Sequence, residues 1–528
     1  MSSITVSRLS WATPDGRNVF SDLDLRFGKE RAGLVGRNGV GKTTLFKLIT
    51  GEARPSAGTV RVDGTLSLLA QSVQAGPQET VADLFGASRA LDALRRAEAG
   101  AASLDELADV DWTIEERIAS ALVRVSLDAQ ADTRLKTLSG GQRTRASLAA
   151  AIFAEPDFLL LDEPSNNLDR AGRAAVIELL AGWRSGAIII SHDRELLEHV
   201  DAIIEMTSLG AARYGGNWSA YRARKAIELE AAQHDLAHAE KRVAEADRKA
   251  QLASERKDRR DAAGARKAAH GGLPRILIGA RKNNAEASRG AGARLADSQR
   301  SQAQDAVAEA RARVEILQHL SITLPSTGLR ASRHVISLDG VVAGYEAGDP
   351  VIRDLSFSIA GPERVALIGP NGSGKTTLLK LIAGDLEPLS GTVSVAVDFA
   401  MLDQQVGILD PALSILDNFK RLNPGSNENA CRAALAGFLF RADAALQEVG
   451  TLSGGQMLRA GLACVLGGLR PPSLLILDEP TNHLDIDSIE AVEEGLSAYD
   501  GALLVVSHDE AFLANIGISR RLCLSGHA

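Results

Sequence analysis

The chain repeats its own motifs, and this repeat constrains the fold more than any other feature of the sequence. Four short motifs of the first half return in the same order in the second half, the first of them after 333 residues. The motif pairs are 36–43 with 369–376, 138–142 with 452–456, 159–164 with 475–480, and 191–193 with 507–509. We therefore expect two copies of one domain, at residues 1–218 and 334–528, joined by a different segment at 219–333.

The pattern within each copy predicts an α/β domain. Short apolar runs that suit buried strands alternate with stretches that suit helices. In the first copy strands are expected at 31–35, 157–161 and 187–190, with a helix at 43–49; in the second copy the strands are at 364–368, 473–477 and 502–506, with a helix at 376–382. Alternating strands and helices predict a largely parallel sheet that binds its ligand at the carboxyl ends of the strands.

The first motif has the composition of a phosphate-binding loop. Gly-x-x-x-x-Gly-Lys-Thr stands between an expected strand and an expected helix, which is the context that gives this motif its meaning. Its glycines let backbone N–H groups face an anion, and the helix N-terminus adds a positive dipole end. Lys42 and Lys375 are expected at the β- and γ-phosphates, with Thr43 and Thr376 as Mg²⁺ ligands. The two expected loops are Gly36, Arg37, Asn38, Gly39, Val40, Gly41, Lys42, Thr43 and Thr44, and Gly369, Pro370, Asn371, Gly372, Ser373, Gly374, Lys375, Thr376 and Thr377.

Acidic residues and histidines follow the later strands of each copy. Asp162 and Asp478 end apolar strands, where a carboxylate can hold the magnesium ion from the side opposite the threonine. A glutamate comes next, and it is the candidate that orients or deprotonates an attacking water. A histidine lies 30 residues after each aspartate and is the candidate sensor of the γ-phosphate. The catalytic candidates are Glu163, Glu479, His192 and His508. Their identical spacing disfavours plain structural roles.

The Leu-Ser-Gly-Gly-Gln motif is the most informative one. A serine suited to cap a helix precedes glycines that allow close approach to an anion. With the motifs around it, the chain resembles an ATP-binding cassette protein, in which the signature of one cassette completes the nucleotide site of the other. The resemblance implies that Ser139, Gly140, Gly141 and Gln142 of cassette 1 (1–218) serve the site of cassette 2 (334–528), and that Ser453, Gly454, Gly455 and Gln456 serve the site of cassette 1.

The same resemblance implies further site residues and the cofactors ATP and Mg²⁺. The Q-loop of the family falls on Gln71 and on Gln404, with Gln405 as the neighbouring alternative, and places a glutamine near the metal. The aromatic residue that stacks on adenine falls on Tyr345 and, less directly, on Trp11. The D-loops fall at 165–169 and 481–485.

The segment between the two copies is basic, although the whole chain is acidic. Residues 219–321 hold 21 Lys and Arg against 14 Asp and Glu, in a chain of net charge −8. Apolar residues at 229–253 and 303–317 follow a 3–4 alternation that predicts an antiparallel helical hairpin with its tip near 254–298. The bias at the tip favours a phosphate-backbone contact over a solvated face. The candidate RNA contacts are Arg256, Lys257, Arg259, Arg260, Arg266, Lys267, Arg275, Arg281, Lys282 and Arg289.

Two tandem cassettes around such a linker resemble the ABC-F family, soluble ATPases that act on the ribosome. The Tyr-Gly-Gly-Asn-Trp-Ser-Ala-Tyr segment at 214–221 is similar to the segment that enters the linker in that family. The resemblance implies that ATP binding closes the cassettes and hydrolysis releases them, with the linker reaching ribosomal RNA and peptidyl-tRNA. General translation, ribosome assembly and antibiotic protection stay open as roles. The alternatives are the ATP-binding subunit of a transporter and a DNA-binding repair ATPase.

Composition narrows the setting. No apolar run approaches the roughly 18–20 residues that a membrane-spanning helix needs, and the first residues suggest no secretory signal. The three cysteines are far apart in the sequence, which argues against a disulfide framework or a four-cysteine zinc site. We therefore expect a cytoplasmic protein without membrane insertion, working as a monomer whose own cassettes pair.

Overall fold

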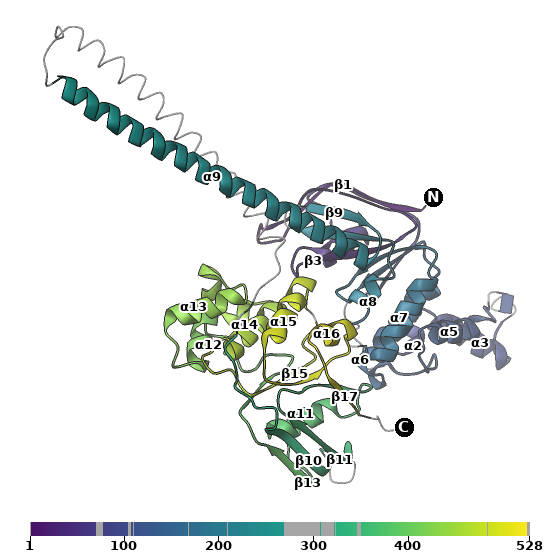
Figure 1. Ribbon diagram of the computed structural model, residues 1–528. Helices are drawn as coiled ribbons and strands as arrows, with labels where there is room; N and C mark the ends of the chain where they lie inside the picture. The colour runs from purple at the N-terminus through teal and green to yellow at the C-terminus, as the bar shows by residue number, and fades with distance from the viewer. Residues whose placement is uncertain are drawn as a thin grey trace. The chain divides into compact units, whose positions relative to one another are not determined.

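The computed structural model (Figure 1) describes residues 2–69, 76, 78–103, 107–108, 110–166, 168–207, 210–268, 307, 322, 324–345, 350–482 and 484–524. By its internal contacts the chain divides into two units, Met1–Ser219 with Leu320–Ala528, and Ala220–His319. Both cassettes lie in the first unit, and the second unit is part of the segment between them. The domain boundaries after residues 218 and 333 stay a prediction.

Cassette 1 combines strands and helices, which alternate one by one between residues 140 and 207. Its elements are β1 (Ser3–Ala12), β2 (Asn18–Phe27), β3 (Arg31–Gly36), α1 (Lys42–Ile49), β4 (Ala57–Asp63), β5 (Leu66–Leu69), α2 (Val81–Leu84), α3 (Ser88–Glu98), α5 (Ile114–Arg124), a 3-10 helix (Leu135–Thr137), α6 (Gly140–Phe153), β6 (Phe158–Asp162), α7 (Arg170–Gly182), β7 (Gly186–Ile190), α8 (Arg194–Leu197), β8 (Ala202–Thr207) and β9 (Gly210–Gly215).

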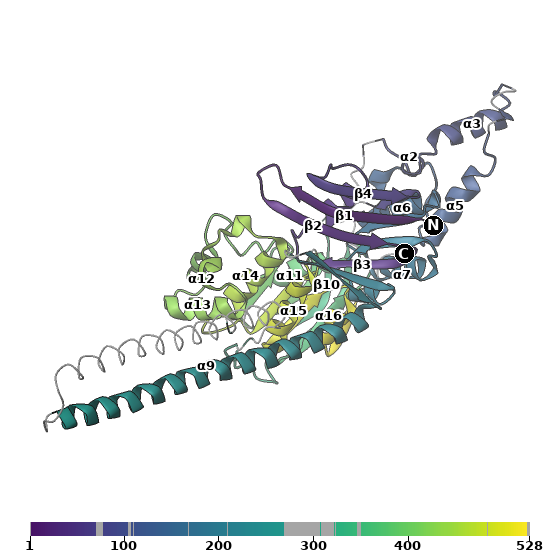
Figure 2. The same cartoon turned by 90° about the horizontal axis from the view of Figure 1, so that it is seen from above.

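The strands of cassette 1 form two sheets. The larger one has the order β5-β6-β7-β3-β8-β9 and is parallel except for the pairing of β8 with β9, which is antiparallel. Every residue of β6 and of β7 is buried, as expected for parallel strands with both faces covered. A separate antiparallel sheet has the order β2-β1-β4, and its three strands lie side by side in Figure 2. The parallel sheet confirms the predicted α/β class, whereas the small antiparallel sheet was not predicted.

Cassette 2 repeats this plan. Its elements are β10 (His334–Ala343), β11 (Ile352–Ala360), β12 (Arg364–Ile368), α11 (Lys375–Ala383), β13 (Ser390–Val395), β14 (Phe399–Leu402), α12 (Ile415–Leu422), α13 (Glu428–Gly437), 3-10 helices (Ala442–Leu446 and Val449–Thr451), α14 (Gly454–Leu466), β15 (Leu474–Asp478), α15 (Ile486–Ala498), β16 (Ala502–Val506), α16 (Glu510–Asn515) and β17 (Arg520–Cys523).

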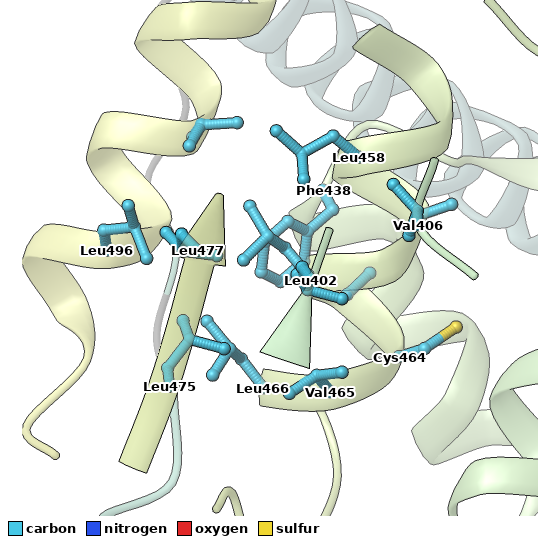
Figure 3. Close-up of a cluster of buried hydrophobic side chains, with 14 of the residues drawn as sticks. Leu402, Val406, Phe438, Leu458, Cys464, Val465, Leu466, Leu475, Leu477 and Leu496 are labelled. Carbon is cyan, nitrogen blue, oxygen red and sulfur yellow. The ribbon is translucent and has the colours of Figure 1, made fainter. Parts of the chain in front are cut away.

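The sheets of cassette 2 match those of cassette 1. The parallel sheet has the order β14-β15-β16-β12-β17, and the antiparallel one the order β11-β10-β13. One face of the parallel sheet packs against helices through a cluster of buried side chains that includes Leu402, Leu458, Leu475 and Leu477 (Figure 3). A second cluster lies between the parallel and the antiparallel sheets and includes Ile476 from the same strand. Alternate residues of β15 thus serve opposite cores, which fixes the register of the strand whose last residue is Asp478.

A single helix, α9 (Trp218–Ala268), covers 51 residues of the segment after cassette 1. The predicted tip was placed too early, because the helix continues past residue 254 to Ala268. The stretch 254–268 is rich in Ala, Lys and Arg, which are strong helix formers, and the cost of about 1 kcal/mol at Gly264 does not end the helix. Ala232 and Ala239, both on the predicted apolar seam, are buried. The expected return helix lies outside the described residues except for residue 307, so the hairpin stays a prediction.

Candidate nucleotide sites

Each expected phosphate-binding loop joins a buried strand to a helix of the parallel sheet. β3 leads into α1, and β12 leads into α11. Gly41 and Gly374 cap these helices with φ of 105° and 92°. A Cβ at Gly41 would also lie 2.6 Å from side-chain atoms of Phe20 and Val19. Glycine is therefore required at this point for both conformation and space.

The lysine of each loop is held inside its own loop. The Lys42 ammonium donates to the carbonyl oxygens of Gly36 and Arg37 at 2.6 and 3.1 Å. Lys375 donates to the equivalent carbonyls at 2.8 and 2.9 Å. Burial lowers the pKa of both lysines, against the opposing effect of Glu163 on Lys42 and of Glu479 on Lys375. A buried cation held by neutral carbonyls in a glycine-rich loop is suited to an anionic ligand.

A threonine and an aspartate meet beside each lysine. Asp162 ends β6 and accepts a hydrogen bond from Thr43, and Asp478 ends β15 and accepts one from Thr376. Burial raises the pKa of both aspartates. Hydroxyl and carboxylate oxygens are the ligands that Mg²⁺ prefers, in combination with substrate phosphates. The pairs therefore fit the metal positions expected from the sequence.

Each glutamate that is a catalytic candidate is turned toward its switch histidine, the candidate γ-phosphate sensor, by an unusual backbone conformation. Glu163 and Glu479 have φ of 52° and 47°, in the left-handed region that non-glycine residues rarely adopt. Their N–H groups donate to carbonyl oxygens at the end of the neighbouring strand, both at 2.9 Å. The Nε2 atom of His192 lies 3.2 Å from Oε1 of Glu163, and the corresponding distance from His508 to Glu479 is 3.4 Å. The turn thus brings both side chains of a pair together.

Burial shifts the two glutamates and the two histidines in opposite directions. It raises the pKa of Glu163 to about 8 and that of Glu479 to about 7, against the effect of the nearby lysine. Burial and the same lysines lower the pKa of His192 to about 3 and that of His508 to about 4. The imidazoles are therefore neutral at neutral pH. A carboxylate with a raised pKa is a stronger base than an ordinary glutamate once it is deprotonated, which suits a general base.

The signature serines cap long helices. Ser139 caps α6 by accepting from the N–H of Gln142 at 3.2 Å, and the amide oxygen of Gln142 accepts from the N–H of Ser139 at 2.8 Å. Ser453 and Gln456 form the same capping box on α14, at 3.3 and 2.9 Å. A Cβ at Gly140 or Gly454 would meet nothing within 4 Å. The backbone at the start of each helix is therefore open to a ligand.

The two cassettes share a cavity that joins the signature of one to the nucleotide loop of the other. The cavity has a volume of about 460 Å³. Its lining includes Ser139, Gly140 and Gly141 of cassette 1 together with Asn371, Gly372, Gln404, Glu479 and His508 of cassette 2. Glu163 and His192 also face it. Part of the crossed site expected for cassette 2 is therefore brought together in this cavity, whereas Lys375, Asp478 and Gln142 do not line it.

Different contacts connect the nucleotide loop of cassette 1 to cassette 2. The N–H of Asn38 donates to Asp485 at 2.8 Å, and Arg37 forms an ion pair with Asp487 at the same distance. Asp485 ends the D-loop and caps α15 by accepting from Ser488. The signature residues Ser453 and Gln456 do not line the shared cavity. The contacts from cassette 2 to this loop thus come from the last residue of the D-loop and from the first turn of α15, and the expected pairing with Ser453 and Gln456 stays a prediction.

The two expected adenine-stacking residues, Trp11 and Tyr345, do not occupy equivalent positions in the two cassettes. Tyr345 follows β10 and is 62% exposed, with the Lys380 ammonium 5.5 Å from its ring centre. Trp11 lies within β1 opposite Phe20, and in cassette 2 the matching pair is Ala343 with Ile352. Trp11 therefore corresponds to Ala343, two residues before Tyr345. It packs partly buried against the core of cassette 1.

Some expected residues lie outside the described part of the chain. Gln71 is one, and Arg275, Arg281, Lys282 and Arg289 are the others. The backbone of α9 carries Arg256, Lys257, Arg259, Arg260, Arg266 and Lys267. The side chain of Arg259 is exposed. A phosphate contact by this group stays a prediction.

Several site residues were missed by sequence reasoning. Arg173 lines the shared cavity, and Asp193 and Asp509 lie there directly after the switch histidines. The two aspartates also cap α8 and α16. Their repeated place after each histidine was a signal that could have been used. Arg173 had no such signal, because the position is not repeated.

Comparison with known proteins defines the class. A family model described as ABC transporter matches residues 21–166 and 352–482. The crossed sites and this match identify a protein with tandem ATP-binding cassettes. The chain belongs to the ABC-F family and is an ATPase that binds and hydrolyses ATP. In the described residues no helix is both long and apolar enough to cross a membrane.

The similar proteins cover almost the whole chain. The tylosin resistance ATP-binding protein TlrC of Streptomyces fradiae is 35% identical, over 94% of this chain and 92% of its own length. The ATP-binding protein Uup of Haemophilus influenzae is 31% identical, over 91% of this chain and 72% of its own. Among solved structures, the archaeal ribosome recycling factor aABCE1, crystallised with the ribosomal stalk protein aP1, has a TM-score of 0.59 at 18% identity. It covers 98% of this chain and 87% of its own, and this likeness shows the fold alone.

Proposed function

We propose that this ATPase binds the ribosome in the cytoplasm and protects it from an antibiotic. The observation that carries the proposal is the 35% identity to a protein named for tylosin resistance, over nearly the full length of both chains. ATP binding holds the two cassettes together around the crossed sites, and hydrolysis releases them. The linker contacts ribosomal RNA and peptidyl-tRNA, and the protein acts as a monomer.

The geometry supports the closing step. The γ-phosphate side of each site faces residues of both cassettes, since Glu479 and His508 share a cavity with Ser139 of the other cassette. A nucleotide between them adds contacts to both sides, which favours the closed arrangement. After hydrolysis the γ-phosphate no longer joins the two halves, so the cassettes separate more easily.

Translation in vitro with the drug present tests the proposal. Purified protein with ATP should restore synthesis by ribosomes inhibited with tylosin, whereas the Lys42→Ala, Lys375→Ala variant should not. Co-sedimentation with ribosomes should depend on ATP. Sedimentation without restored synthesis would favour a general translation role. A preference for DNA, or co-purification with membranes, would contradict the proposal and support the repair or transporter alternative.

Magnesium removal is the first of our predictions. We propose that Thr43 with Asp162, and Thr376 with Asp478, hold Mg²⁺ together with the nucleotide phosphates. Chelation with EDTA should abolish ATP hydrolysis, because the charge on the phosphates is then not neutralised. Restoring Mg²⁺ should restore the rate. Turnover that persists in excess EDTA would contradict these metal positions.

The basic linker gives the second prediction. Replacing Arg256, Lys257, Arg259 and Arg260 with Gln should flatten the salt dependence of ribosome binding by up to about one unit of slope per lost phosphate contact. ATP affinity should change by less than about twofold. The measurement is co-sedimentation with ribosomes across a salt series, in protein that also carries Glu163→Gln and Glu479→Gln so that bound ATP is not hydrolysed.

A matched control uses the same helix. Replacing the exposed Arg224, Lys241, Arg242 and Arg248 with Gln removes the same charge nearer the start of α9. This control should keep the wild-type slope. An equal slope in all three proteins would show that the charge near the predicted tip only faces solvent.

A further inference from the structure

A group of buried charges lies behind the two switch histidines. We call it the central charge cluster, and it consists of Arg173, Asp193, Arg194, Glu493 and Asp509. Arg194 donates through Nη1 to both carboxylate oxygens of Glu493, at 2.8 and 3.1 Å. This pair joins α8 of cassette 1 to α15 of cassette 2, and both side chains are about nine-tenths buried. The cluster thus spans the boundary between the cassettes.

Arg173 is the member that touches both switch segments. Its Nη1 donates to the main-chain carbonyl oxygen of His508 at 2.6 Å. Its Nη2 lies 2.8 Å from Oδ2 of Asp193, the residue after His192. The side chain is 15% exposed and lines the shared cavity. One planar guanidinium therefore connects the loop that carries the switch histidine of each cassette.

The repeat offers no second copy of this bridge. Asp169 caps α7 and Asp485 caps α15 in the same way, each by accepting from the N–H three residues later. Counted from these caps, the position of Arg173 is taken in cassette 2 by Ile489, which is buried. In the part of the chain that the structure describes, Arg173 of cassette 1 therefore connects the two switch segments without an equivalent from cassette 2.

Both switch histidines need a defined position to act. His508 Nε2 is buried and has no hydrogen-bond partner in the described part of the chain, although it lies 3.4 Å from Glu479. An imidazole held in this way is placed mainly by its own backbone. A donor on the His508 carbonyl oxygen therefore acts directly on the placement of the ring.

We propose that Arg173 is a positioning residue that fixes the two switch segments relative to each other, so that both histidines are placed for hydrolysis when the cassettes are together. The inference rests on the ATPase activity and on the crossed sites. It adds a residue that was not assigned to either nucleotide site. It does not place Arg173 on the nucleotide. The residue acts through the His508 carbonyl and through Asp193.

Steady-state ATP hydrolysis by two variants of Arg173, compared with the wild type, tests the idea. Arg173→Ile introduces the side chain that cassette 2 has at this position, and should lower kcat about 10- to 100-fold, because a misplaced catalytic group costs rate. The KM for ATP should stay within about twofold, because the phosphate-binding loops are unchanged. Arg173→Lys keeps the charge but cannot reach both partners in one plane. Its kcat should therefore fall between that of the wild type and that of Arg173→Ile.

Arg170→Ile is the matched control. It removes the same charge from the first turn of the same helix, at a side chain that is 75% exposed and pairs with Glu510 at 3.5 Å. Its kcat and KM should match wild type. Arg173→Gln, closer in length and still polar, serves if Arg173→Ile does not fold.

Three results would overturn the inference. The first is a kcat of Arg173→Ile or Arg173→Gln within twofold of wild type. The second is a rise in KM that accounts for the whole loss, which would make Arg173 a nucleotide contact. The third is full activity of Arg173→Lys, which would reduce its role to charge alone. Absence of ATP hydrolysis by the wild-type protein would instead remove the activity itself, which is a distinct outcome.

Discussion

Replacing Glu163 and Glu479 together by glutamine should lower ATP turnover by about 10²- to 10⁴-fold, the range that general-base catalysis contributes. Glutamine keeps the size and shape of the side chain but cannot take a proton from water. The lysines, threonines and signature residues are untouched, so ATP affinity should stay close to wild type. Turnover follows from phosphate release, and affinity from titration with a fluorescent ATP analogue.

The same variant should remain on the ribosome when ATP is present, because in the proposed function hydrolysis releases the protein. Glu178→Gln with Glu494→Gln is the matched control. These exposed glutamates occupy equivalent places on α7 and α15 and lie outside the sites. The control should hydrolyse ATP like wild type. Normal turnover by the double variant at the sites would show that another group takes the proton.

Replacing Lys42 and Lys375 together by alanine should weaken ATP binding at least about 100-fold. Hydrogen bonds to charged groups contribute roughly 1.5–3 kcal/mol each, and each site loses the cation expected at the phosphates. These ammonium groups are buried and donate to main-chain carbonyl oxygens of their own loops, so they are poised for an anion. The measurement is the equilibrium affinity for ATP.

The control replaces a lysine outside the sites in each cassette. Lys29→Ala removes an exposed side chain, and Lys420→Ala removes one that pairs with Glu428 at the surface. ATP affinity should be unchanged. If the double variant at Lys42 and Lys375 still bound ATP like wild type, the assignment of the phosphate-binding loops would be wrong.

Much of the site could be predicted because each motif is local. A loop such as 36–43 fixes its own backbone through glycines, and its neighbours in sequence are its neighbours in space. The turn that brings Glu163 beside His192 could be anticipated only in part. Alternation along a strand places adjacent residues on opposite faces, and it is the left-handed conformation of Glu163 that changes the direction.

The remaining features depend on contacts between distant parts of the chain. Arg173 contacts His508, 335 residues away, and no local pattern marks it as different from Arg170, the other arginine of α7. The resemblance placed the adenine-stacking residue on Tyr345 and, less directly, on Trp11, but the strand register matches Trp11 to Ala343. The end of α9 was misplaced because charge and glycine content were given more weight than helix propensity.

The left-handed backbone of Glu163 and Glu479 places the stability of the protein in conflict with the proposed catalytic role of these residues. In this conformation a residue with a Cβ destabilises the fold by roughly 1–2 kcal/mol relative to glycine. Selection for thermal stability alone would therefore favour glycine at both positions. The resulting protein would be more stable but would lack the candidate general base for ATP hydrolysis. Each cassette thus has a locally destabilising backbone conformation at its candidate general base. Consensus or thermostability engineering of this chain therefore has to leave both glutamates unchanged.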